Sequence, residues 1–260
     1  MKLSASSSAL LGALALLITP AASAASVSWD GDANDGLWSS PTNWSNDSVP
    51  GSGDTVTVND ASVTWDITAN NGTYDPSTLD LTGTSTLTLN GVFRANGASV
   101  TVGSEASLAA SGNTVFYDWN NGSVTFDAGA KFTNGVWENK GTNQFTFNLD
   151  AGGFDTLTPS FVNISGANFS TTTYTVDLGA YTGATGTITL VDFGGEFGDN
   201  LTNATFQTSI HQILNAGAYA GSTLSYDDAN DAILLNLVPE PSSALLTVAG
   251  LGLCLFRRRS

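Results

Sequence analysis

Two ten-residue segments of this chain repeat one another at an offset of 24 residues. They are SVTVGSEASL, which begins at Ser99, and SVTFDAGAKF, which begins at Ser123, and both carry apolar residues at the same four positions. A weaker third copy, FTFNLDAGGF, begins at Phe145. One coil of a parallel β-helix takes about 20 to 25 residues and buries its inward face only by stacking on the next coil. The repeat therefore predicts a short parallel β-helix, or solenoid; the alternative is a β-sandwich whose hairpins have similar compositions.

Apolar residues alternate with Thr, Ser, Asn and Asp in short runs over most of the chain between residues 25 and 237. A period of two is typical of half-buried strands, and threonine itself favours strands. The body of the chain is therefore predicted to be all-β. The alternation is clearest at Val63, Trp65 and Ile67, at Leu87 and Leu89, at Tyr174, Val176 and Leu178, and at Ile233, Leu235 and Leu237.

One stretch, ATFQTSIHQILNAG over residues 204–217, has apolar residues at roughly helical spacing before a glycine, and it predicts a helix. LSYDDANDAILLNL, from Leu224, reads as two strands around a polar turn. We therefore expect β-coils over residues 61–200, and a helix with two closing strands over residues 201–237.

The segment over residues 25–60 is rich in tryptophan, with Trp29, Trp38 and Trp44 placed among turn-forming residues before a GDTVTV strand. A solenoid needs a cap over the open end of its core, and tryptophan covers the most surface per residue. The segment resembles the leading segment of exported bacterial proteins that carry autotransporter-associated β-strand repeats. That resemblance implies a cap on the first coil.

Charge is distributed very unevenly along the chain. Residues 25–238 contain 22 acidic side chains and only three basic ones, Arg94, Lys131 and Lys140. Nucleic-acid binding depends on Lys and Arg that replace counterions at the phosphates, so this composition excludes nucleic acid as a partner. The single cysteine, Cys254, excludes a disulfide within the chain.

The N-terminus has the three parts of a secretory signal peptide. Lys2 precedes the apolar run ALLGALALLI, and small residues at Ala22 and Ala24 follow it. Ten apolar residues are too few to span a bilayer, which argues against the alternative of a membrane anchor. We expect signal peptidase to remove residues 1–24.

The C-terminus has a second sorting pattern over residues 238–260. Val238-Pro239-Glu240-Pro241 is followed by thirteen mostly apolar residues, Ala244 to Phe256, and then by Arg257, Arg258 and Arg259. Prolines disfavour a helix, so the tripeptide Pro-Glu-Pro is predicted to be extended and accessible. The apolar run is short for a membrane-spanning helix, but snorkelling arginines on the cytoplasmic side make a transient span of the inner membrane feasible.

These parts, in this order, resemble the PEP-CTERM sorting signal of Gram-negative bacteria, for which an ordinary tail anchor is the alternative. The resemblance implies recognition by an exosortase-type enzyme in the inner membrane. It also implies export to the cell surface or to an extracellular matrix of exopolysaccharide, as in a biofilm.

Residues that could carry catalysis or bind a metal are sparse. The acidic turn from Asp30 does not fit an EF-hand, because its sixth and twelfth positions are Asp35 and Pro41 rather than Gly and Glu. Weak calcium binding by another arrangement of the carboxylates, at this turn or from Asp227 to Asp231, is the one cofactor left open. His211 is the only histidine and no GxSxG motif is present, which argues against a serine hydrolase.

Trp119 and Trp137 lie in Asn- and Gly-rich sequence and are the candidate glycan contacts, with corner packing as the structural alternative. The leading hypothesis is a non-enzymatic structural protein without catalytic residues. A glycan-binding adhesin and a polysaccharide-cleaving β-helix enzyme are the alternatives. Lys131, the one basic residue within the repeat, is expected to point into water. Threonine-rich strands are also typical of flat ice-binding faces, but strand propensity explains these threonines.

Overall fold

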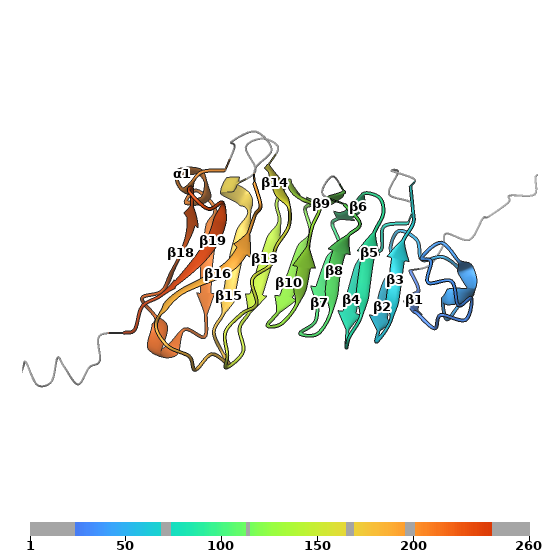
Figure 1. The fold of residues 1–260 in the computed structure, drawn as a ribbon, viewed down its shortest axis with the longest axis horizontal. Coiled ribbons are helices and arrows are strands. Elements are labelled where there is room, and N and C mark those ends of the chain that lie inside the picture. The colour runs from blue at the N-terminus through green and yellow to red at the C-terminus, as the bar shows by residue number, and fades with distance from the viewer. Residues whose placement is uncertain (1–23, 69–73, 113–114, 165–168, 196–200, 241–260) are drawn as a thin grey trace, which may run out of the picture.

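The computed structural model describes residues 24–68, 74–112, 115–164, 169–195 and 201–240, and the strands of these residues are stacked side by side along one long axis (Figure 1). The chain winds through about four turns of a β-solenoid with three parallel sheets. The Trp-rich segment lies at one end of the stack and the last two strands lie near the other end (Figure 1). The sequence-based expectation of an all-β solenoid is therefore confirmed.

Successive coils add neighbouring strands to three parallel sheets, and the first sheet continues beyond the other two at both ends. The first sheet contains β1 (Ser26–Ser28), β2 (Thr55–Asn59), β4 (Thr78–Thr82), β7 (Ser99–Val102), β10 (Ser123–Asp127), β13 (Gln144–Asn148), β15 (Thr173–Asp177) and β17 (Ile210–Leu214). The second sheet contains β3 (Ser62–Trp65), β5 (Thr86–Leu89), β8 (Ser107–Ala110) and β11 (Lys131–Thr133). The third sheet contains β6 (Phe93–Asn96), β9 (Phe116–Asn120), β12 (Val136–Lys140) and β14 (Phe161–Ile164).

The strand register reproduces the internal repeat. Ser99 of β7 lies beside Ser123 of β10, and Ser123 lies beside Gln144 of β13, so the offset of the sequence repeat is the length of one coil. All of these pairs are parallel, whereas the hairpins of a β-sandwich would be antiparallel. The β-sandwich alternative is therefore wrong.

The core is a continuous column of aromatic rings inside the three sheets. From the capped end, Trp65 contacts Phe93 at 5.2 Å between ring centroids, and Phe93 contacts Trp119 at 6.3 Å. Trp137 then contacts Trp119 at 5.9 Å and Phe145 at 4.7 Å. These five side chains have at most 1% of their surface exposed. The inward residues of each coil therefore pack on those of the next, as stacking requires.

The Trp-rich segment closes the first end of this column, as predicted. Trp38 packs on Trp65 at 4.7 Å and on Trp44 at 4.6 Å, and the indole nitrogen of Trp44 donates to the carbonyl of Trp38 at 2.8 Å. The 3₁₀ helix Pro41–Asn43 lies between them. However, β1 and β2 already belong to the first sheet, so the solenoid begins inside the segment assigned to the cap rather than at residue 61.

The helix predicted over residues 204–217 is wrong for most of its length. A single helical turn, α1 (Asn203–Phe206), ends at Gln207, and the chain then forms β17, which pairs in parallel with β15. The backbone hydrogen bonds that this segment makes with β15 stabilise a strand more than its helical spacing of apolar residues stabilises a helix, because no other element packs against the apolar face that such a helix would have. The solenoid therefore extends to Leu214, beyond the predicted boundary at residue 200.

The closing strands are confirmed. β18 (Thr223–Asp227) and β16 (Gly186–Asp192) flank β19 (Ala232–Leu237) in an antiparallel sheet. Two further 3₁₀ helices, Phe169–Thr171 and Gly217–Tyr219, connect strands at this end. Along the part of the chain that is described, no helix is long and apolar enough to cross a membrane. The predicted signal segment up to residue 23, Pro241, the apolar run Ala244 to Phe256 and the terminal arginines lie outside the described residues.

Candidate functional site

The two candidate glycan contacts are core residues. Trp119 lies on β9 with 0% of its surface exposed, and Trp137 lies on β12 with 1% exposed. Asn120 and Asn139, which suggested turns, still belong to these strands, and the indole rings point inward against Phe145. The assignment of Trp119 and Trp137 as glycan contacts is therefore wrong, and the packing alternative is confirmed.

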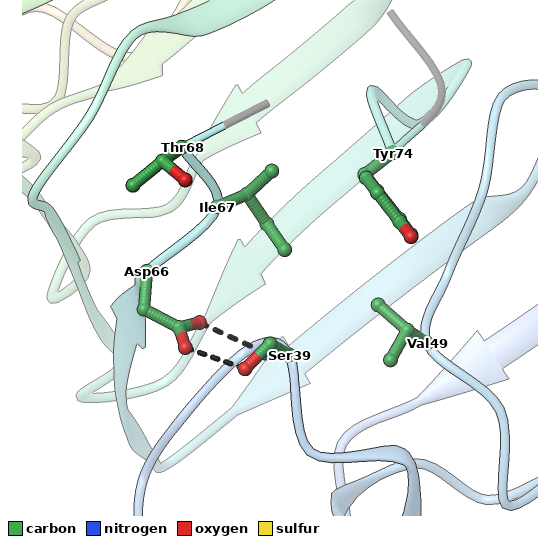
Figure 2. A pocket seen from close by; sticks show the side chains of 6 residues that line it. All are labelled: Ser39, Val49, Asp66, Ile67, Thr68 and Tyr74. Carbon is green, nitrogen blue, oxygen red and sulfur yellow. Dashed lines mark hydrogen bonds between the residues drawn. The ribbon is translucent and has the colours of Figure 1, made fainter. Parts of the chain in front are cut away.

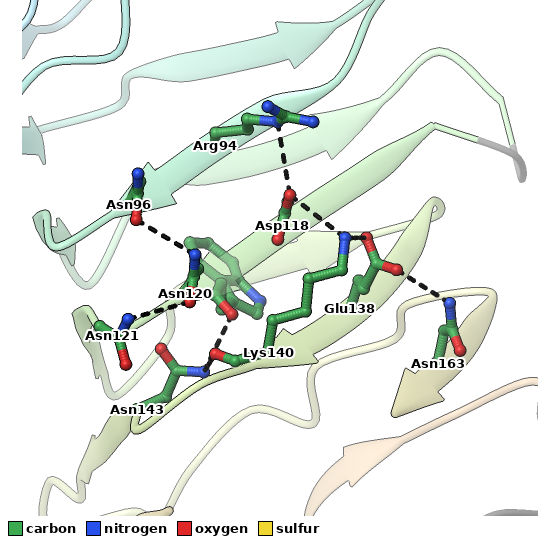
Figure 3. Close-up of polar contacts among 10 residues, drawn as sticks. Arg94, Asn96, Asp118, Asn120, Asn121, Glu138, Lys140, Asn143 and Asn163 are labelled. Atoms are coloured by element: carbon green, nitrogen blue, oxygen red, sulfur yellow. Dashed lines mark hydrogen bonds and ion pairs between the residues drawn. The ribbon is translucent and has the colours of Figure 1, made fainter. Parts of the chain in front are cut away.

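A row of charged and amide side chains crosses the outer face of the third sheet (Figure 3). Strand register places Arg94, Asp118, Glu138 and Asn163 side by side on four successive strands. The ammonium of Lys140 lies 2.7 Å from Glu138 Oε2 and 3.4 Å from Asp118 Oδ2. This charged row contains two of the three basic residues of the body.

The burial of its carboxylates determines whether the charged row can bind a substrate. The side chains of Asp118 and Glu138 are only 8% and 11% exposed, whereas those of Arg94 and Lys140 are about one third exposed. Burial by itself lowers the pKa of Lys140, but the hydrogen bond and charge of Glu138 together with the charge of Asp118 outweigh it, so the pKa is raised. The two nearly buried carboxylates are paired with these partly exposed cations. The row therefore cross-links four coils, and neither carboxylate is open to a substrate.

Asp75 adjoins this row from the loop before β4. Desolvation of the half-buried carboxyl raises its pKa to about 6, against the effect of Arg94, which lowers it, while Asp118 raises it further. Its Oδ2 atom is buried without a hydrogen-bond partner. Asp75 is therefore the one described carboxyl whose ionisation the fold opposes strongly.

The raised pKa of Asp75 predicts a pH-dependent stability. Because the folded state holds the proton more tightly than the unfolded chain, Asp75 costs stability as pH rises from about 4 through about 6. We expect Asp75→Asn to unfold at the same urea concentration as the parent at pH 4. Above pH 7 it should be more stable by about 1 kcal/mol, a value reduced for solvent screening. Asp80→Asn, on the outer face of β4, is the control. If both variants gained the same stability above pH 7, the gain would not come from the raised pKa of Asp75.

Asparagines join the coils at the corner between the third and first sheets (Figure 3). Asn120 donates to Asn96 at 3.2 Å, and the buried Asn143 donates to the carbonyls of Trp119 and Lys140 at 2.9 Å and 2.7 Å. Asn143 Oδ1 also accepts from the amide of Gly122 at 3.0 Å. These amides satisfy backbone groups that the corner leaves unpaired, which is a structural function.

A small pocket of about 230 Å³ lies where the Trp-rich cap meets the first coil (Figure 2). Val49, Ile67 and Tyr74 line it with apolar surface. The carboxylate of Asp66 closes one side by accepting from the amide and hydroxyl of Ser39 at 2.9 Å and 2.5 Å. Ligand pockets usually enclose about 300 to 1,000 Å³. This pocket is therefore the seam between the cap and the first coil.

A larger hollow of about 620 Å³ lies on the outside of the solenoid, at the corner between the first and second sheets. One wall is formed by strand residues that the register places side by side on β5, β8 and β11: Thr86, Ser107 and Lys131. Its other lining residues come from the turns that enter these strands and from the following coil: Thr84, Ser104, Glu105, Gly129 and Asp155. Lys131 is exposed, as expected from its place in the repeat. Sequence reasoning did not single out this hollow, although the 24-residue period aligns Ser107 with Lys131.

The acidic turns are organised by their own hydrogen bonds. Asp35 accepts from Ser40 Oγ, from the amide of Leu37 and from Asn43 Nδ2, and these bonds lower its pKa. Asp227 similarly accepts from Asn230 and from the amide of Ala229. No group of three or more His, Cys, Asp or Glu side chains that could hold a metal ion occurs among the described residues.

The lone histidine lies on β17 and packs against Phe206 at 4.6 Å between rings. Desolvation lowers the pKa of His211, so the imidazole is neutral near pH 7. Ser209 Oγ lies 2.9 Å from His211 Nε2, but the serine proton is donated to the carbonyl of Phe206 at 2.5 Å. In that arrangement the hydroxyl oxygen accepts from His211 Nε2. His211 is not placed to activate Ser209 as a nucleophile.

The described part of the predicted sorting motif leaves the body as an exposed segment directly after β19. Val238, Pro239 and Glu240 are all exposed and outside any strand or helix. The amide of Val238 donates to Ser222 Oγ at 3.1 Å, and the amide of Glu240 donates to the carbonyl of Ala218 at 2.8 Å. These bonds attach the segment to the end of the solenoid while its side chains face solvent.

Comparison with protein-family models, with curated proteins and with solved structures gives no match for this chain.

Proposed function

We propose that this chain is a non-enzymatic structural protein that is exported and then displayed at the cell surface or in an extracellular exopolysaccharide matrix. Signal peptidase removes residues 1–24 during export. The apolar segment Ala244 to Phe256 holds the precursor at the inner membrane, with Arg257 to Arg259 on the cytoplasmic side. An exosortase-type enzyme recognises Pro239-Glu240-Pro241 and releases the body from this anchor.

The observation that carries the proposal is the exposure of Val238, Pro239 and Glu240 directly outside the folded body. A processing enzyme needs an extended peptide that its active site can surround. Pro239 and Glu240 are exposed, and their backbone lies in neither the closing sheet nor a helix. Within the described residues, only the backbone hydrogen bonds of Val238 and Glu240 attach this part of the motif to the body, so an enzyme could reach Pro239 and Glu240 without unfolding the solenoid.

The body suits a structural function outside the cytosol. Its coils stack around a buried aromatic column, so its stability comes from burial and from backbone pairing between coils. Its strong excess of acidic over basic residues favours solubility and opposes adhesion to anionic lipid. The charged row is occupied in cross-linking strands rather than in binding a substrate.

Mass spectrometry of the mature protein tests the sorting mechanism. In a Gram-negative host that has an exosortase, we expect material from the matrix fraction to begin at Ala25 and to lack Arg257 to Arg259. The variant Pro239→Ala/Glu240→Ala should remain in the membrane fraction with its C-terminus intact. Ser242→Ala, just outside the motif, should be processed like the parent. Recovery of matrix material that retains Arg259 would contradict the proposal.

A further inference from the structure

The hollow at the corner between the first and second sheets is a groove that runs across the coils. Four successive coils each contribute a lining residue, and these residues follow one another along the solenoid axis: Thr84, Ser104, Gly129 and Asp155. Neighbouring strands of a sheet lie about 4.8 Å apart, so three such steps cover roughly 15 Å. A second hollow of about 240 Å³ continues from Gly129 and Asp155 toward Gly152. The groove is therefore long and open rather than enclosed.

The chemistry of the groove combines a hydroxyl-lined floor with three free charged groups. Thr84, Thr86, Ser104 and Ser107 supply four hydroxyls. Glu105, Lys131 and Asp155 border them, all three are exposed, and in the described part of the chain none has a side-chain hydrogen bond or an ion pair. This sets the groove apart from the charged row, where each cation is already paired.

Glycine shapes the groove wall at one position. Gly129 has φ +85°, and a Cβ atom there would lie 2.4 Å from the carbonyl oxygen of Ser104. The turns of two successive coils can therefore meet only because residue 129 lacks a side chain. Their contact keeps the groove floor continuous from Ser104 to Lys131.

We propose that this groove binds a segment of a neutral, hydroxyl-rich polysaccharide that lies along the solenoid axis. The carboxylates of Glu105 and Asp155 accept hydrogen bonds from sugar hydroxyls, and the ammonium of Lys131 donates one, which are charge-assisted bonds. An open groove admits a polymer, whereas a small molecule needs an enclosed pocket. The excess of acidic over basic residues, both in the groove and over the whole body, repels polyanionic chains. The inference rests on the proposed function, because a matrix protein needs a contact with the polysaccharide.

Affinity gel electrophoresis of the protein as isolated from cells tests this site. The gels contain dextran, laminarin, xyloglucan or galactomannan, with alginate as the polyanionic comparison. We expect retardation by at least one neutral polysaccharide and none by alginate. Lys131→Ala and Glu105→Gln/Asp155→Asn should bind about ten-fold more weakly, as loss of charge-assisted hydrogen bonds predicts. Lys131→Arg, which keeps the charge, should retain most of the binding.

Asp80→Asn is the matched control, because it removes one carboxylate from the outer face of the first sheet, away from the groove. It should be retarded like the parent. Retardation only by alginate, no retardation by any of the neutral polysaccharides, or equal weakening by Asp80→Asn would overturn the groove as a polysaccharide site. None of these results bears on sorting, which is measured separately from the mature termini.

Discussion

Replacement of Trp137 by Ala is expected to lower the free energy of unfolding by about 3 to 5 kcal/mol, the usual cost of truncating a large buried aromatic residue. The indole is 1% exposed and contacts Phe132, Phe145 and Phe193 at ring distances of 5.3, 4.7 and 6.0 Å. Truncation leaves a cavity in the middle of the column, where the flanking coils cannot close it. Urea denaturation followed by near-UV circular dichroism measures the loss.

Two variants show that the loss comes from the cavity. Trp137→Phe retains a ring and should lose less than half as much stability. Thr146→Ala, on the outer side of β13, removes no core volume and should change stability by less than about 0.5 kcal/mol. If Trp137→Ala unfolds like the parent, the indole is not part of the core, and its exclusion as a glycan contact would have to be withdrawn.

Substitution of Gly135 by Ala should destabilise the solenoid by about 2 to 4 kcal/mol, from backbone strain together with overpacking. Gly135 has φ +72°, and a Cβ atom there would lie 2.6 Å from the ring of Tyr117 and 2.9 Å from the carbonyl oxygen of Val115. The turn into β12 therefore has no room for a methyl group. Thermal unfolding of the purified variant measures the effect.

Gly97→Ala separates the two contributions. Gly97 has nearly the same backbone angle, φ +71°, but a Cβ atom there would meet no atom within 4 Å. Its replacement should cost only the strain of a left-handed backbone, about 1 kcal/mol. Equal losses for the two variants would show that overpacking at Gly135 contributes nothing.

The coil architecture could be predicted because it depends on residues whose spacing is visible in the sequence. Val100 and Val124, and likewise Leu108 and Phe132, face inward at equivalent positions of two coils and lie side by side in the sheets. Each coil must bury the same face, so the sequence repeats its apolar positions with the length of a coil. The charged row had a similar signal, since Arg94 and Asp118 are one coil apart.

Two expectations failed where local sequence was ambiguous. The polar residues after Trp119 and Trp137 are typical of turns, but here they continue the strands β9 and β12, and the indoles before them face the core. The apolar residues of 204–217 fit a helix, yet Ile210 and Leu214 are outward and exposed on the edge strand β17. The segment becomes a strand because its backbone pairs with the otherwise free edge of β15, and this edge is not visible in the local sequence.

Composition and the periods along the chain are enough to predict an all-β body, the coil length, a tryptophan cap and an acidic surface with few cations. The parallel register was needed to exclude a β-sandwich. Which of the aligned side chains share a surface, and which of them are paired, depends on how the chain winds in three dimensions. Thr84, Lys131 and Asp155 line one groove although they are far apart in the chain, because winding places the same corner of every coil in a single line. Lys131 is left free there while Lys140 is paired, since burial and contact depend on neighbouring coils and not on residue type.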